Sequence, residues 1–202
     1  AADQMQLYKL ICRQVAQSQG MTASFLPKPI TGINGSGMHT NISLARDGKN
    51  LFYDAKGEHG LSALGHQFIA RILNVADDIC LVLNPSVNSY RRLDPNYEAP
   101  NEIKSSAVNR STMIRIPLGN QNSARIEVRS VAPDANPYML IYTLLKAGIA
   151  GPDPEPIDPE KRPRTRILPD NIMSAIRLFK KSEFISDTWG ENMQSKYVEL
   201  KQ

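Results

Sequence analysis

One predicted strand carries the residues of this chain whose types and spacing are best suited to chemistry. Residues 123–129, Ser-Ala-Arg-Ile-Glu-Val-Arg, alternate with the period of two that is typical of a β-strand. This alternation places Arg125, Glu127 and Arg129 on one face, and the small and apolar residues on the other. A cation, an anion and a cation in one row suit a polyanionic substrate and its metal ion. The structural alternative is an ordinary exposed strand with mixed charges.

A glycine-rich stretch leads to a second candidate. In Asn-Gly-Ser-Gly-Met-His, residues 34–39, the glycines stand where a backbone needs positive φ or a close approach to a ligand. His39 then begins a predicted strand over 38–44, in which His39, Asn41 and Ser43 face one way. The stretch is not a Walker A loop, because no Gly-Lys-Ser/Thr follows. From the spacing alone, a hairpin turn beside a satisfied surface histidine is the favoured interpretation.

Two further segments carry arginines. Residues 86–106 have few apolar side chains and predict a long loop, which could bring Arg92 onto a carboxylate or phosphate and move Glu98 as a gate. In the segment 109–117, Arg110 is expected on a loop and Arg115 on the strand that follows. Solvated surface charge is the alternative for each of these segments.

The elements that must position these residues follow from hydrophobic periodicity and from cap residues. A first helix is expected over 3–19, with Asp3 as its N-cap and Leu7, Leu10, Ile11 and Val15 as its apolar stripe. Further helices are expected over 61–83 with a break near 77–78, over 136–148, from a cap at Asp170, and over 190–202. Further strands are expected over 23–26, 112–117 and 124–131, with a hairpin turn at 46–50.

Strands and helices in this order, without regular βαβ alternation, predict an α+β fold with a mostly antiparallel sheet and flanking helices. Residues 1–151 are expected to form the core, 152–169 a proline-rich extended segment, and 170–202 a C-terminal helical part of the same domain.

Composition limits the classes of function. The chain has 202 residues, of which 41% are hydrophobic and 22% charged, which predicts a soluble globular protein without a membrane span. The net charge of +4 is dispersed, which argues against a nucleic-acid-binding module. Cys12 and Cys80 fall among apolar residues and are expected to be buried free thiols in a reducing cytoplasm.

Taken together, the motifs resemble the catalytic domain of glutamine synthetase, in particular the type I group of bacteria and archaea. The resemblance covers nearly the whole chain and is weakest after residue 151. It is carried by the first helix and by five ordered motifs, at residues 24–29, 34–39, 84–100, 109–117 and 125–129, and it continues into 134–138.

The resemblance implies a guanido-kinase-like fold and an activity in nitrogen metabolism and glutamine biosynthesis. The reaction would be the ATP-dependent ligation of ammonia to L-glutamate through γ-glutamyl phosphate, with two or more Mg²⁺ or Mn²⁺ ions in a complete site. Arginines and metal ions suit this reaction, because negative charge accumulates on the transferring phosphoryl oxygens.

The resemblance also assigns roles to residues. Metal ligation falls to His39 and Glu127, and catalysis to Glu98, Arg110 and Arg129. Glutamate binding is assigned to Asn34, Gly35, Arg92, Arg110 and Arg129. ATP binding is assigned to Asn41, Ser43, Arg110, Arg115 and Arg125. Asn41 departs from the pattern, since many relatives carry a histidine there.

Length is the largest departure from the family pattern. The resemblance implies that these 202 residues do not include the family's N-terminal β-grasp domain, which in the family supplies part of the site of a neighbouring subunit. We therefore expect the 202-residue chain alone to be inactive, and the full-length protein to be a cytoplasmic homo-oligomer, a dodecamer.

Two alternatives remain open at this stage. One is a ligase of the same family that joins glutamate to a different amine, such as a polyamine. The other is a non-catalytic relative that only binds nucleotide.

Overall fold

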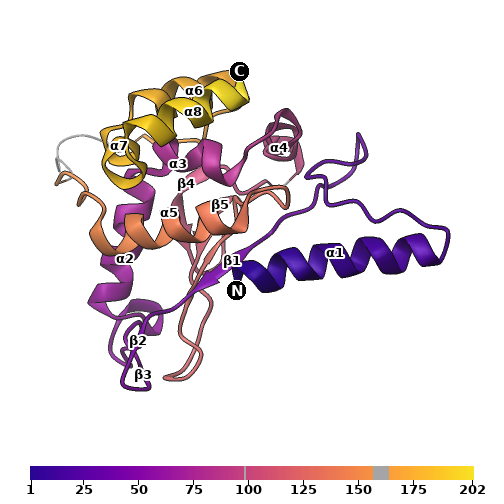
Figure 1. Cartoon of the computed structure of the whole chain (residues 1–202). Coiled ribbons are helices and arrows are strands. Elements are labelled where there is room, and N and C mark those ends of the chain that lie inside the picture. Colours follow the sequence, from indigo (N-terminus) through magenta and orange to yellow (C-terminus); the bar gives the residue numbers. More distant parts are fainter. Residues whose placement is uncertain (98, 157–163) are drawn as a thin grey trace.

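A four-stranded sheet lies at the centre of the computed structural model, which describes residues 1–97, 99–156 and 164–202 (Figure 1). The strands stand in the order β1-β6-β5-β4. Their bounds are Thr40–Ile42 for β1, Glu102–Ser106 for β4, Thr112–Arg115 for β5 and Ile126–Val128 for β6. β6 pairs antiparallel with both β1 and β5, whereas β4 runs parallel to β5. The predicted α+β class is confirmed, with a sheet that is mixed rather than purely antiparallel.

A short hairpin follows β1. Its strands are β2, Ala45–Arg46, and β3, Lys49–Asn50. Asp47 has φ 50° and Gly48 has φ 75°, both in the left-handed region that a two-residue turn of type I′ requires. The predicted turn at 46–50 is therefore confirmed.

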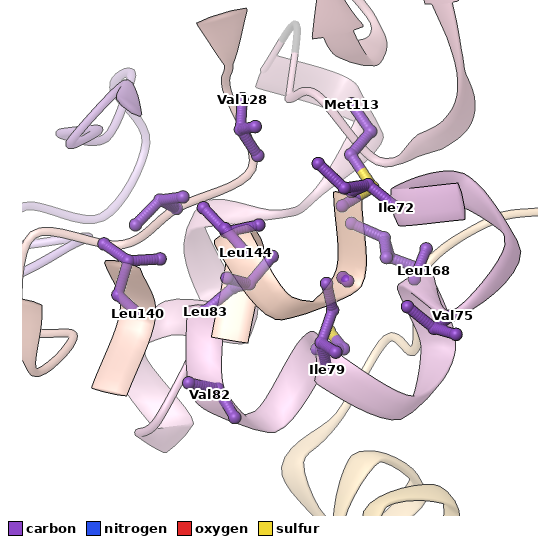
Figure 2. Packing of buried hydrophobic residues seen from close by; sticks show 14 of the residues in the cluster. Ile72, Val75, Ile79, Val82, Leu83, Met113, Val128, Leu140, Leu144 and Leu168 are labelled. Carbon is purple, nitrogen blue, oxygen red and sulfur yellow. The ribbon is translucent and has the colours of Figure 1, made fainter. Parts of the chain in front are cut away.

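Helices cover the apolar face of the sheet. They are α2, Ala63–Asn74; α3, Ala76–Leu83; and α5, Pro137–Ala150. Side chains of these helices pack with Met113 and Val128 of the sheet in one continuous core (Figure 2). α3 is apolar on almost every side, and six of its eight residues are buried, as expected of a helix enclosed by other elements.

The last three helices pack on the far side of α3. They are α6, Ile172–Lys181; α7, Glu183–Trp189; and α8, Glu191–Lys201. Phe179 of α6 meets Trp189 and Tyr197 in a cluster of three aromatic rings. The cap of α6 is Asn171, not the predicted Asp170, because the Asn171 side chain accepts the hydrogen bond from the amide of Ser174.

The region 86–106 differs most from its prediction as a loop. It contains α4, Val87–Arg92, the 3-10 helix η2, Pro95–Tyr97, and the strand β4. α4 has only six residues, so hydrophobic periodicity could not reveal it; a capping box between Ser86 and Ser89 starts it instead. β4 is defined by its parallel partner β5, a long-range contact that local pattern does not show.

Smaller corrections concern strand and helix limits. The predicted strand at 23–26 is not formed, and the strand predicted over 38–44 is limited to β1. The long helix breaks at Val75, slightly before the predicted 77–78. A second 3-10 helix, η1, spans Glu58–Gly60.

The first helix, α1, spans Ala2–Ser18, and its N-cap is Ala1 rather than the predicted Asp3. Its predicted apolar stripe of Leu7, Leu10, Ile11 and Val15 is 48–57% exposed, although such a stripe usually faces a core. In Figure 1 the helix extends away from those that cover the sheet. It contacts α5, where the Tyr138 hydroxyl donates to Asp3, and its buried Lys9 ammonium donates to the Pro133 carbonyl at 2.5 Å.

Cys80 is buried as predicted, whereas Cys12 on α1 is only partly buried. Among the described residues, no helix combines the length and apolar character needed to cross a membrane.

Candidate functional site

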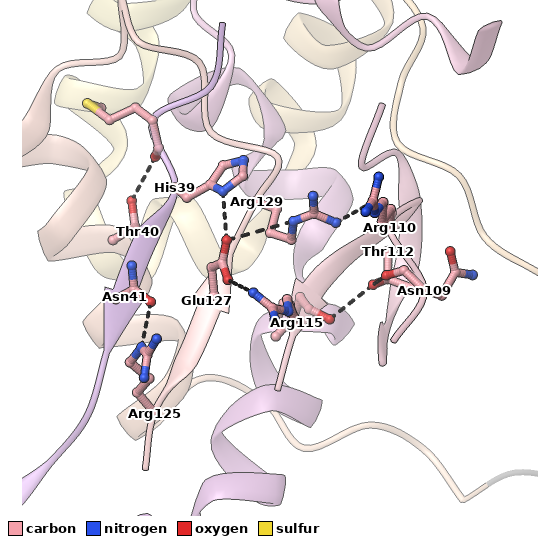
Figure 3. A network of polar contacts seen from close by, with 12 residues as sticks. His39, Thr40, Asn41, Asn109, Arg110, Thr112, Arg115, Arg125, Glu127 and Arg129 are labelled. Carbon is pink, nitrogen blue, oxygen red and sulfur yellow. Dashed lines mark hydrogen bonds and ion pairs between the residues drawn. The ribbon is translucent and has the colours of Figure 1, made fainter. Parts of the chain in front are cut away.

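Strand register brings the predicted charged residues to one place. Glu127 on β6 lies directly opposite Asn41 on β1 and Arg115 on β5. Residues directly opposite each other in a sheet project from the same face, so these side chains share the face that the core helices do not cover. Figure 3 shows Glu127 at the centre of the resulting polar network.

Glu127 is a buried carboxylate held by three basic side chains. One of its oxygens, Oε1, is 2.6 Å from His39 Nδ1 and 3.8 Å from Arg129 Nε, and the other, Oε2, is 3.2 Å from Arg115 Nη1. The whole residue is 8% exposed. A buried carboxylate is stable only with such partners. Its position at the centre of the sheet is therefore tightly defined.

The His39 imidazole is kept neutral by its surroundings. Burial is the largest effect that lowers its pKa; Glu127 opposes this effect, while Arg129 and Arg92 add to it. In a neutral ring the Nδ1–H donates to Glu127, and Nε2 then keeps a free lone pair. A neutral imidazole oriented by a carboxylate is suited to metal ligation.

Arg125 and Asn41 form a second contact on the same face. Arg125 Nε donates to Asn41 Oδ1 at 3.0 Å, and its Nη1 donates to the Ser123 carbonyl at 3.2 Å. This pairing orients the guanidinium beside the Glu127 network, where it could meet an anion.

Arg92 reaches the site from the end of α4. It is 6% exposed, and its Nη2 donates to the Arg129 carbonyl at 2.9 Å. Burial lowers the pKa of Arg92 to about 10, with repulsion from Arg129 as the second cause, so the side chain stays charged at neutral pH. Arg129 in turn donates from Nη1 to the Arg110 carbonyl.

Two buried N–H groups of this cluster have no hydrogen-bond acceptor among the described residues. They are Arg92 Nη1 and Arg129 Nε; the latter has only the ion pair with Glu127 Oε1, which at 3.8 Å is too long for a hydrogen bond. Buried donors on charged groups are nearly always paired, because leaving them unpaired costs free energy. Unpaired donors of two adjacent guanidiniums therefore point to an anionic ligand.

The glycines of the 34–39 motif are explained by close approach to Arg92. A Cβ on Gly37 would lie 2.5 Å from Arg92 Nη2 and 3.1 Å from the His39 ring. A Cβ on Gly35 would lie 2.4 Å from the Pro27 carbonyl oxygen and 3.0 Å from Arg92 Cγ. Neither glycine has a positive φ. Of the two reasons that the sequence suggested for these glycines, close approach is the one that holds.

The structure unites most of the predicted site residues. A single connected network contains His39, Arg92, Arg110, Arg115, Glu127 and Arg129, and Asn41 with Arg125 lies on the same face of the sheet. Asn34 and Ser43 are exposed and contribute no side-chain contact to this network. Glu98 lies outside the described residues.

Sequence reasoning missed the residues that hold α4 in place. Asp134 accepts hydrogen bonds from the Ser86 hydroxyl at 2.6 Å and from the Ser89 hydroxyl at 3.2 Å. These contacts tie the start of α4 to the segment after β6. The spacing of two serines three residues apart was a usable signal for a helix start, but the partner Asp134 is 45 residues away from Ser89.

The donor set fits a divalent cation in part. Among the described residues no cluster of three or more His, Cys, Asp or Glu could hold a metal ion. His39 and Glu127 nevertheless supply one nitrogen and one carboxylate. Mg²⁺ in phosphoryl-transfer sites is commonly held by one or two protein groups, with waters and substrate phosphates completing six ligands.

Comparison with known proteins agrees with the geometry. The family model described as glutamine synthetase, catalytic domain, matches residues 1–202. The chain is 40% identical to the glutamine synthetase of Clostridium saccharobutylicum, over 98% of this chain and 48% of that protein. It is also 40% identical to the enzymes named glutamine synthetase in Staphylococcus aureus and Thermus thermophilus, over 100% of this chain and 48% of each.

The chain thus spans about half the length of the curated relatives it matches. The family model, in contrast, covers it from its first residue to its last. On these grounds the chain belongs to the glutamine synthetase family, within the catalytic domain of that family.

Proposed function

We propose that this chain forms the phosphate- and glutamate-binding part of an ATP-dependent glutamate–ammonia ligase. The observation that carries the proposal is the buried Glu127, held by His39, Arg115 and Arg129 on the open face of the sheet. Family membership supports the reaction class. The names of the relatives favour ammonia over another amine as the acceptor.

In the proposed reaction the γ-carboxylate of glutamate attacks the γ-phosphorus of ATP. The bond to the ADP oxygen breaks, and γ-glutamyl phosphate and ADP are formed. Ammonia then attacks the acyl carbon and displaces inorganic phosphate, which leaves glutamine. Both steps move negative charge onto oxygens that preorganised cations can stabilise.

We assign each arginine a role in binding phosphate groups according to its position on the sheet. Arg115 and Arg125 stand on either side of Glu127 along the open face, where we assign them to the phosphates of ATP together with Asn41 and Ser43. Arg110 and Arg129 are linked through the Arg110 carbonyl, and we assign them to the transferring phosphoryl group.

Glutamate is assigned to the opposite end of the network. Arg92 Nη1 and Arg129 Nε make no hydrogen bond among the described residues, so they could bind a carboxylate. The Asn34–Gly35 backbone passes within contact distance of Arg92, so it could bind the same substrate. Glu98 is proposed from the family resemblance alone, as the residue that receives a proton from ammonium.

His39 and Glu127 would hold a Mg²⁺ or Mn²⁺ ion, whose chemistry is to neutralise charge on phosphate oxygens. A complete site with two or more ions needs donors beyond the described residues. We propose that further glutamate ligands from the full-length protein complete the metal site, and that the β-grasp domain of a neighbouring subunit supplies another part of the active site, within a dodecamer. The guanido-kinase-like architecture is part of the same proposal.

Mn²⁺ binding tests the metal site directly. Titration followed by electron paramagnetic resonance should show a site that Glu127→Gln weakens about 10- to 100-fold. The matched control is Glu58→Gln, which removes the carboxylate of the surface pair formed by His59 and Glu58 at 3.6 Å. Equal Mn²⁺ affinity in wild type and Glu127→Gln would contradict the assignment.

A further inference from the structure

The loop that brings Asn34 and Gly35 to the site is held on the body of the domain by Pro27 and Lys28, while Phe25 before them packs on Tyr8 of α1. Residues 21–37 form no helix or strand, and only Pro27 and Lys28 of this stretch are buried. A surface segment of this length would sample many conformations without an anchor. The contacts of Pro27 and Lys28 therefore decide where Asn34 lies.

Asn88 on α4 binds Lys28 through both ends of its side-chain amide. Its Oδ1 accepts a hydrogen bond from the Lys28 amide at 2.7 Å, and its Nδ2 donates to the Lys28 carbonyl at 3.0 Å. Pro27 and Pro29 flank Lys28 and have no backbone N–H. The Lys28 amide is thus the one backbone N–H donor of this tripeptide. Asn88 binds both the N–H and the C=O of Lys28, as the backbone of an adjacent β-strand would.

Two further hydrogen bonds connect Pro27 and Lys28 to the rest of the loop. The Lys28 ammonium donates to the carbonyl of Ile33, the residue directly before Asn34. The Ser36 amide donates to the Pro27 carbonyl at 2.7 Å, which closes the loop on the same anchor from the other side. Asn34 and Gly35 therefore lie between two contacts that both lead back to Pro27 and Lys28.

α4 also supplies Arg92, four residues after Asn88. Side chains at this spacing lie on one side of a helix. The same side of α4 therefore holds the loop through Asn88 and meets Gly35 and Gly37 through Arg92. One short helix fixes both the loop and the guanidinium relative to each other.

We infer that Asn88 is a positioning residue, which holds the 28–36 loop so that Asn34 and Gly35 stay in register with Arg92 for glutamate. The inference rests on the proposed function of this loop. It also explains the residue type: aspartate keeps the acceptor but loses the donor, and alanine loses both.

Hydrogen exchange tests the anchor without any ligand. In Asn88→Ala we expect the Ser36 amide to exchange at least about tenfold faster, because the loop opens without unfolding the domain. The Met38 amide is the internal control, since it is held by the Val131 carbonyl at 2.9 Å and not by the anchor. Asn88→Asp should give an intermediate rate.

Ligand titration tests the positioning role. If the loop holds the bound geometry about a tenth of the time in Asn88→Ala, L-glutamate affinity falls about tenfold, while Mn²⁺ affinity at His39 and Glu127 stays within about twofold. The L-glutamate affinity would be measured from the nuclear magnetic resonance shifts of the Asn34 and Gly35 amides, and the Mn²⁺ affinity by electron paramagnetic resonance. Asn171→Ala, which removes the cap of α6 and lies near Val87 and Arg91 of α4 rather than near Asn88 and Arg92, is the matched control and should change neither affinity.

The outcomes separate the two proposals. Unchanged Ser36 exchange in Asn88→Ala would overturn the inference, as would a parallel loss of glutamate and Mn²⁺ affinity. A wild-type chain that binds neither Mn²⁺ nor glutamate would overturn the proposed function instead, and the exchange result would still report on the anchor.

Discussion

At the scale of single residues, the site depends on how tightly Arg92 is enclosed. Its guanidinium is buried beside a second cation, Arg129, and the backbone of Gly37 passes close to it. These neighbours fix the position of the guanidinium relative to a bound anion. Substitutions that move the guanidinium slightly should therefore affect ligand binding more than stability.

Gly37→Ala tests this expectation. The new Cβ would lie 2.5 Å from Arg92 Nη2, the end of a flexible side chain, which must then move. We expect glutamate affinity to fall about tenfold and the free energy of unfolding to fall by less than about 1 kcal/mol. Calorimetry would measure the glutamate affinity and urea denaturation the free energy of unfolding. Ser36→Ala, a change at the exposed neighbouring residue, is the control. A large loss of stability in Gly37→Ala would contradict this expectation.

The two cysteines should react very differently with a thiol reagent. Burial raises the pKa of the Cys80 thiol to about 12, so it forms almost no thiolate at neutral pH. Cys12 on α1 is partly exposed. Titration with a chromogenic disulfide should show one fast equivalent in the folded protein and a second only in denaturant. Two fast equivalents would show that Cys80 is accessible.

At the scale of elements, α4 determines the site although it has only six residues. Such a helix is too short to be stable by itself. Its start is held by the capping box of Ser86 and Ser89 and by Asp134. Substitutions that destabilise α4 should therefore also alter the geometry of the site.

Ser86→Ala removes both the cap and one bond to Asp134. We expect it to lower the free energy of unfolding by about 1 kcal/mol, the usual cost of a lost N-cap, and also to weaken glutamate binding. Asn171→Ala removes the cap of α6 and should cost a similar amount without affecting binding. Chemical denaturation combined with glutamate titration checks both variants; normal glutamate binding by Ser86→Ala would separate α4 from the site.

The crossing of α2 and α5 gives a prediction for the core. A Cβ on Gly148 would lie 2.3–2.4 Å from the ring of Phe68, which is fully buried against Phe52. Overpacking of this kind costs about 1–3 kcal/mol, more than the roughly 1 kcal/mol that alanine gains over glycine in a helix. Gly148→Ala should therefore lower the urea midpoint, and a raised midpoint would show that the ring can move aside.

At the scale of the whole molecule, the proposed metal site offers His39 and Glu127, and no cluster of three or more His, Cys, Asp or Glu in the described part of the chain could hold a metal ion. The relatives named glutamine synthetase are about twice as long as this chain. A site for two or more metal ions therefore needs further groups, which agrees with the proposal that further glutamate ligands from the full-length protein complete it.

Because the proposed metal site needs further groups, we expect no glutamine formation by the 202-residue chain alone. An assay with ATP, L-glutamate, ammonium and Mg²⁺ should show turnover no higher than in Glu127→Gln. The same preparation should still bind Mn²⁺ in the wild type, which distinguishes an incomplete site from an unfolded chain. Measurable turnover by the chain alone would contradict the prediction.

Much of the fold followed from local signals. The hairpin at 46–50, the capped helix beginning at Pro137, and the alternation that buries Ile126 and Val128 beneath Glu127 are each set by neighbouring residues, so sequence reasoning found them. β4, by contrast, depends on its parallel partner β5, and α4 is stabilised by Asp134 from a distant part of the chain.

By itself, the sequence determined the residue types of the site and the family, because charge, glycine and strand alternation are local properties that stand in order along the chain. Only the tertiary structure decided which of these residues meet. Register placed Asn41 and Arg115 opposite Glu127, and the burial of Arg92 explained the glycines. It also showed that the apolar stripe of α1 is exposed, because burial depends on what packs against a surface and not on the pattern alone.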